Sequence, residues 1–161
     1  MPTKTITQEL KQHHDEMRKL VAEIKKNKPE KFVLLKKHLD IHHELEEDLL
    51  LSHLNTKKGI KDESLESQEE HFVLNILLLD LKDFPKDHDR WMIKFKVFDE
   101  ILDHHLTEEE EDLFPDAEKK LDKKLLEEMG EKFAELKTQR LSAALETKDV
   151  KEKATKSKSK K

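Results

Sequence analysis

The sequence predicts an all-α protein, an up-down-up-down four-helix bundle with an additional C-terminal helix. The chain has 161 residues, of which 43% are charged, and it contains only two glycines and four prolines. So few helix breakers argue against a turn-rich β fold, and runs rich in Glu, Lys and Leu are typical of long helices. Four long helices with short links favour a bundle, against which the fifth helix packs.

The first helix is expected to begin at Thr5, because Thr5 and Gln8 match a capping box. Its apolar residues recur with helical period, and it should end near the NKPE segment, residues 27–30. Pro29 can occupy the first turn of a second helix. That second helix is predicted to continue to about Leu50.

The middle of the chain supplies two more helices. The segment 52–64 is predicted to be a loop, with Gly59 at its turn. A third helix covers roughly residues 65–82 and ends before Pro85. A fourth helix, over about 90–113, carries aromatic and aliphatic residues on one stripe.

The C-terminal part of the chain divides into a helix and a tail. A fifth helix is expected over roughly 117–146, so that residues 1–146 form the domain. Residues 147–161 are rich in lysine and nearly free of apolar side chains, which predicts a disordered basic tail. The net charge of −5 makes the body a poor candidate for binding nucleic acid, so only weak binding through the tail is expected.

The sequence lacks cysteine and lacks long apolar segments, and both absences exclude classes of protein. The chain has no cysteine, which excludes disulfides, thiolate zinc sites, iron–sulfur clusters and cysteine nucleophiles. The N-terminal segment lacks the apolar core of a signal peptide, and no stretch approaches the roughly 18 apolar residues of a membrane span. A soluble, cytoplasmic protein that does not enter the membrane is expected.

Four of the ten histidines lie on the apolar stripes of the four predicted bundle helices. His14 lies between Leu10 and Met17 at helical spacing, and His42 continues the stripe of the second helix. On the third and fourth helices the corresponding residues are His71 and His105. Each bundle helix therefore offers one histidine on its inward face.

Two glutamates follow two of these histidines at the same spacing. Glu46 lies four residues after His42, and Glu109 lies four residues after His105. Residues at i and i+4 project from one helix face about 6 Å apart, so each His-x-x-x-Glu pair can reach one metal ion or bridge two. A buried glutamate is costly unless it is paired or bound to metal, and two ions would satisfy all six side chains.

An internal repeat supports this choice of positions. The segments HHELEEDLLLS and HLTEEEEDLFP superpose with a shift of about 63 residues, which matches His42 with His105 and Glu46 with Glu109. The repeat therefore favours His105 over His104 as the metal ligand.

Four further residues lie close to the predicted ligands. His43 and His104 lie one position away from ligand histidines and are expected in the second shell or at the surface. His38 lies one turn before His42 and is assigned to the second shell or the core, with direct ligation as the minor alternative. Glu110 is expected to be solvated or to hydrogen-bond to an imidazole N–H group.

The motifs QHHDEM (12–17), HHELEE (42–47), EEH (69–71) and HHLTEEEEDLFP (104–115) together resemble the hemerythrin HHE cation-binding domain. The resemblance covers about residues 5–145. It implies a four-helix bundle with two non-haem iron ions joined by an oxo or hydroxo bridge, bridging glutamates, and histidines that each cap one ion. The ligands so implied are His14, His42, Glu46, His71, His105 and Glu109.

The sequence departs from the oxygen-carrying members of that family at one position. Those members have a second histidine four residues after the one in the third helix, and here that residue is Asn75. Mixed imidazole and carboxylate ligation also suits manganese or zinc. The Glu-x-x-His spacing of ferritin-like di-iron proteins does not occur in the chain.

The function expected first is a non-haem di-iron protein that binds or senses oxygen or a related small oxidant. The alternative is a di-iron enzyme that acts on hydrogen peroxide or nitric oxide, which requires the same ligands. Iron storage is less favoured, because one such site holds two ions. A metal-free bundle used for protein interaction would bind no metal.

Overall fold

The computed structural model describes residues 2–158 of the chain, with side chains up to residue 145. Its helices are α1 Ile6–Lys25, α2 Phe32–Glu46, α3 Ser52–Leu54, α4 Lys61–Asp83, α5 Asp89–Glu108, α6 Phe114–Lys120 and α7 Lys123–Lys158. A 3₁₀ turn, Pro29–Lys31, precedes α2, and π-helical turns, Glu47–Leu51 and Glu109–Leu113, follow α2 and α5. The described part contains no β-strand.

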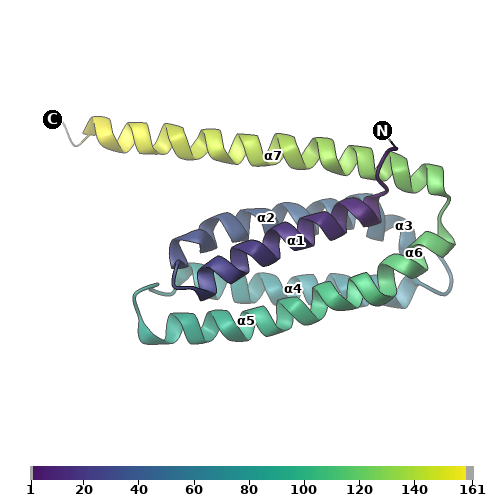
Figure 1. Cartoon of the computed structure of the whole chain (residues 1–161), viewed down its shortest axis with the longest axis horizontal. Coiled ribbons are helices and arrows are strands. Elements are labelled where there is room, and N and C mark those ends of the chain that lie inside the picture. Colours follow the sequence, from purple (N-terminus) through teal and green to yellow (C-terminus); the bar gives the residue numbers. More distant parts are fainter. Residues whose placement is uncertain (1, 159–161) are drawn as a thin grey trace.

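The predicted all-α bundle is confirmed. Helices α1, α2, α4 and α5 run up and down beside one another, and α7 lies along α1 and α2 on the side away from α4 and α5 (Figure 1). The predicted capping box is also present, because Gln8 N donates to Thr5 Oγ1 at 3.3 Å and Thr5 N donates to Gln8 Oε1 at 3.0 Å.

Two predicted helix boundaries are wrong. Helix α4 begins at Lys61 rather than near residue 65, because Ser64 is buried within the helix and donates to Leu51 O at 3.2 Å. The predicted single helix over 117–146 is divided instead. Its N-terminal part belongs to α6, and the buried Leu121 adopts an extended conformation before α7 begins. Pro115 lies in the first turn of α6, where its ring is tolerated.

The apolar core has two layers. One layer joins the start of α1 to α6 and α7 and includes Leu10, Leu45 and Phe133. The other joins the end of α1 to α4 and α5 and includes Met17, Phe32 and Trp91. Along α1 and α2, and where α4 and α5 join the segments before and after them, buried polar residues lie near the boundary between the two layers. This polar layer, in the middle of the bundle, contains the predicted ligands.

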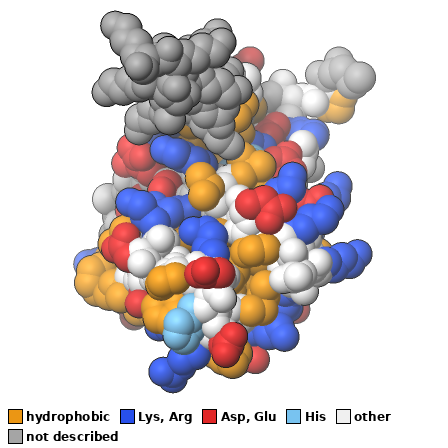
Figure 2. Space-filling model, turned by 90° about the vertical axis from the view of Figure 1, so that its left-hand side faces the viewer, with side chains coloured by type: hydrophobic (Ala, Val, Ile, Leu, Met, Phe, Trp, Pro, Cys, Tyr) orange, Lys and Arg blue, Asp and Glu red, His pale blue; other side chains and the backbone are white. Residues whose placement is uncertain are grey.

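The lysine-rich segment 147–161 lies outside the residues whose side chains the structure describes. Helix α7 nevertheless continues to Lys158, so the backbone of residues 147–158 is helical where a disordered tail was predicted, whereas the domain limit at residue 146 stays a prediction. None of the helices in the described part is long and apolar enough to cross a membrane. At the end of the bundle that carries the α1–α2 and α4–α5 connections, acidic, basic and apolar side chains are interspersed (Figure 2).

Candidate metal centre

The structure brings all six predicted ligand side chains together in the polar layer. Each is at least 96% buried, and they come from all four bundle helices and the π turn after α5. They are His14, His42, Glu46, His71, His105 and Glu109. The helical period of the apolar residues predicted that these side chains point into the bundle, and they are buried there.

The Nε2 atoms of the histidines face the two carboxylates. His42 Nε2 lies 3.4 Å from Glu46 Oε2, and His71 Nε2 lies 3.7 Å from the same oxygen. His105 Nε2 lies 3.0 Å from Glu109 Oε1, and His14 Nε2 lies 3.6 Å from it. Each glutamate thus lies between imidazoles of two helices, the position that a carboxylate shared between two ions would take.

Several of these buried atoms have no hydrogen-bond partner among the described residues. They are both carboxylate oxygens of Glu46, Oε1 of Glu109, and the Nε2 atoms of His71 and His105. Leaving a buried polar group unsatisfied costs about 1–3 kcal/mol, so buried polar groups are almost always paired. The unpaired atoms are all lone-pair donors of the kinds that bind iron, manganese or zinc, so the residues fit a metal.

The other ring nitrogen of three of these histidines is held by a carboxylate from elsewhere in the fold. His14 Nδ1 lies 3.0 Å from Glu110 Oε1, a contact that corresponds to one of the two expectations for Glu110. His71 Nδ1 lies 2.9 Å from Glu47 Oε1, and His105 Nδ1 lies 3.1 Å from Glu70 Oε1. A carboxylate on Nδ1 fixes the ring orientation and leaves the Nε2 lone pair free for a metal.

The fourth histidine, His42, is held by a second imidazole instead. Its Nδ1 lies 3.0 Å from His13 Nδ1, and His13 Nε2 lies 2.8 Å from His38 Nδ1. Burial and the charge of Lys137 lower the pKa of His13 to about 2, so the ring is neutral. If His42 offers Nε2 to a metal, its Nδ1–H donates to His13, whose Nε2–H donates to His38.

His38 is therefore connected to His42 only through His13, and it lies half-buried at the outer end of this row of three histidines. His13 is fully buried beneath α7, with the edge of Phe133 at 6.0 Å between ring centroids. The sequence pattern assigned no role to His13. Only the packing of α7 shows that it supports His42.

His43 and His104, both predicted as second-shell or surface residues, differ sharply. The His104 side chain is 71% exposed and lies 3.3 Å from Glu108 at the surface. His43 is buried, and its ring stacks on His71 with centroids 3.9 Å apart. Burial and the neighbouring histidines lower the pKa of His43 well below its usual value, so this ring is also neutral.

The buried charges of the centre shift the pKa values of its glutamates and of His105. Burial raises the pKa of Glu46, and the facing carboxylate of Glu109 raises it further. Burial opposes ionisation of Glu109 as well, but the adjacent His105 lowers the pKa of Glu109 well below its usual range. Burial likewise opposes protonation of His105, yet Glu109 and Glu70 raise its pKa to about 10. Glu109 and Glu70 thus favour the protonated form of His105.

The chain also matches a known protein family. Residues 5–117 match the model of the hemerythrin HHE cation-binding domain. The chain belongs to this family. The family is named for cation binding, and the polar layer of this chain contains clusters of histidines and glutamates that could hold a cation. The resemblance seen in the four sequence motifs is thereby confirmed.

A solved structure supports the same assignment. The crystal structure of a hemerythrin HHE cation-binding domain-containing protein from Mycobacterium kansasii is similar with a TM-score of 0.77 and 27% sequence identity. The match covers 88% of this chain and 90% of that one. A comparison with curated proteins gives no significant match.

An acidic pocket of about 270 Å³ reaches the centre of this HHE domain from outside. It lies between α4 and the end of α5, and one of its walls is the buried Glu109. Ser67 on the opposite wall donates a hydrogen bond to Glu109 Oε2 at 3.2 Å. The pocket is lined by Glu63, Glu66, Ser67, Glu70, Glu108, Glu109, Asp112, Leu113 and Asp116.

The two π-helical turns lie within one residue of equivalent places in the internal repeat, one directly after Glu46 and the other starting at Glu109. A π turn widens the helix by one residue and often marks a functional site. Sequence reasoning treated both segments as ordinary helix. The repeated sequence around them was the available signal, but periodicity over five residues cannot separate a π turn from an α-helix.

Proposed function

We propose that this protein is a non-haem di-iron protein that binds or senses oxygen or a related small oxidant. The observation that carries the proposal is the pair of buried carboxylates, Glu46 and Glu109, each between histidines of two helices and each with unpaired oxygen. Membership of a cation-binding family supports a metal there. Two iron ions would supply electrons and open coordination positions for a small ligand.

Different residues of the chain would bind the metal ions, orient the ligands and admit the small molecule. His14 and His42 form one group with Glu109, and the unpaired atoms of His71 form another with both glutamates. The carboxylates on Nδ1 would hold the rings in place, so that little reorganisation accompanies binding. The pocket beside Glu109 would admit the small ligand, while the apolar layers above and below exclude bulk water.

Metal analysis of the full chain, reconstituted with ferrous iron without oxygen, tests the proposal. Two irons per chain are expected, followed by a change in near-ultraviolet and visible absorption on exposure to oxygen. Glu109→Ala should lose iron, whereas Glu111→Ala, an exposed neighbour, should keep it. A wild-type chain that holds no iron, or holds it without any spectral response to oxygen, would contradict the proposal.

The same sample separates binding from turnover. Bound metal should stabilise the fold, by about 2.7 kcal/mol when free metal is a hundredfold above Kd, and chelation should remove that increment. Sustained decay of hydrogen peroxide or nitric oxide by the iron form, absent in Glu109→Ala, would assign an enzyme instead. Absence of such decay supports binding or sensing.

A further inference from the structure

His43 has the environment of a metal ligand rather than that of a structural core histidine. Its Nε2 atom is buried and has no hydrogen-bond partner among the described residues. Core histidines normally hydrogen-bond through their buried nitrogens. No carboxylate or hydroxyl compensates His43 Nε2, and its near neighbours are the rings of two proposed ligands.

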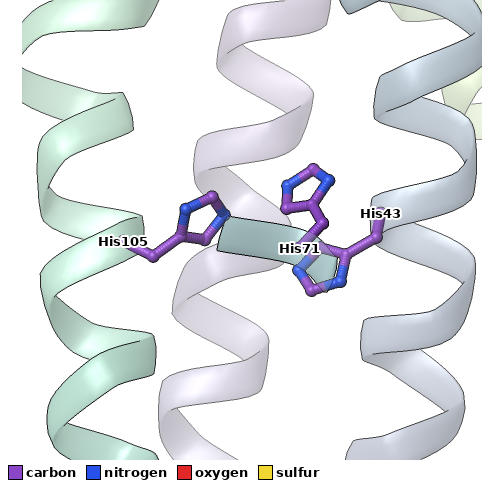
Figure 3. Close-up of side chains that lie close together, drawn as sticks. All are labelled: His43, His71 and His105. Carbon is purple, nitrogen blue, oxygen red and sulfur yellow. The ribbon is translucent and has the colours of Figure 1, made fainter. Parts of the chain in front are cut away.

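The geometry around His43 gathers three imidazoles. The His43 ring stacks on that of His71 at 3.9 Å and 15°, and it meets the ring of His105 edge-on at 5.8 Å. Figure 3 shows the three side chains converging from α2, α4 and α5. One ligand atom from each ring lies within 4.8 Å of the others. Imidazoles on one ion, at about 2.1 Å each, place their donor atoms at most about 4.2 Å apart, so this cluster is close to a binding geometry.

Consecutive residues on α2 face different parts of the site. Successive side chains on a helix diverge by about 100°, so His42 meets His14 of α1, with ring centroids 4.8 Å apart, while His43 meets His71 of α4. One helix can therefore supply a histidine to each of two ions. The third-helix position where a further histidine would project is the exposed Asn75, so α4 itself offers only His71.

We propose that His43 is a direct metal ligand, so that the ion nearer α4 and α5 is held by His43, His71 and His105. This inference rests on the proposed di-metal site and adds a seventh protein ligand to it. The two ions then have unequal surroundings, one with His14 and His42 and the other with three imidazoles. Neutral imidazole suits iron and zinc alike, so the three-histidine cluster should bind either.

Nuclear magnetic resonance on zinc-loaded, ¹⁵N-labelled full chain counts the ligands directly. Long-range correlation spectra report which imidazole nitrogens shift when zinc binds. Five shifted histidines are expected if His43 is a ligand, and four if it is not. Because the count is made on the wild-type chain, it does not depend on whether any variant folds.

Metal titration of variants gives the second readout. His43→Gln should weaken binding of one of two zinc ions by at least about tenfold and remove one shifted imidazole from the spectrum. His104→Gln, an exposed histidine adjacent to another ligand, should bind two ions with wild-type affinity. Two ions bound with unchanged affinity in His43→Gln, or four shifted imidazoles in the wild type, would overturn the assignment of His43 alone. A wild type that binds no metal would overturn the di-metal proposal itself.

Discussion

His14 Nδ1 lies 3.0 Å from Glu110 Oε1, and the same oxygen lies 2.6 Å from Arg18 Nη1. One carboxylate in the π turn after α5 thus contacts both a proposed metal ligand of α1 and a guanidinium one turn further along that helix. Burial raises the pKa of Glu110, but its hydrogen bonds with His14 and Arg18 outweigh burial and lower the pKa to about 2.

Glu110 should therefore make the metal-free fold sensitive to acid. A carboxyl group whose pKa is lower in the folded chain than in the unfolded chain stabilises the fold when the pH is above its unfolded pKa of 4.5. That stabilisation is lost as the pH falls toward the folded pKa of about 2. At pH 7, Glu110→Gln should lower the free energy of unfolding by about 2 kcal/mol, a value already reduced for solvent screening. Denaturant unfolding from pH 7 to pH 2 should show the difference from wild type disappear. The matched control is Glu111→Gln, a change at an exposed residue. If Glu110→Gln lowered the free energy of unfolding by the same amount at every pH, the effect would not come from the ionised Glu110 carboxylate.

Glu46 should oppose stability in the absence of metal. Burial and the facing Glu109 raise the pKa of Glu46, so the folded chain is destabilised once the pH exceeds the unfolded pKa of the carboxyl. Glu46→Gln should raise the free energy of unfolding of the metal-free chain at pH 7 by about 1–3 kcal/mol, yet abolish tight metal binding. Thermal unfolding with and without metal measures both effects. Glu69→Gln, an exposed change on α4, should alter neither, and a less stable metal-free Glu46→Gln would contradict the argument.

Gly130 allows α7 to approach the start of α1. A Cβ atom there would lie 2.7 Å from Thr5 C and 2.8 Å from Ile6 N, which are backbone atoms that cannot move aside cheaply. Gly130→Ala improves helix propensity by about 1 kcal/mol, but the backbone clash should outweigh it and destabilise the domain by about 1–3 kcal/mol. Glu131→Ala, exposed on the same turn, should be neutral. If Gly130→Ala were stabilising, α7 would not be packed against the bundle in this way.

The sequence predicted the fold class and the inward direction of His14, His42, His71 and His105. These predictions succeeded because helical phase is local: a residue three or four positions from a buried leucine shares its face. The His42–Glu46 spacing, repeated at His105, selected the two buried glutamates by the same rule. The boundary of α4 was mistaken, because the burial of Ser64 depends on the distant segment that ends α2.

What surrounds the predicted ligands was decided by tertiary structure. Glu70 precedes His71 in the chain, yet it holds His105 of another helix, and no spacing rule within one helix shows this pairing. His13 is buried because α7, more than a hundred residues away in sequence, packs over α1. His43 faces α4 because the bundle buries a wider arc of α2 than its leucine stripe. Local periodicity determines which way a side chain points along its own helix, but only long-range packing determines what it meets there.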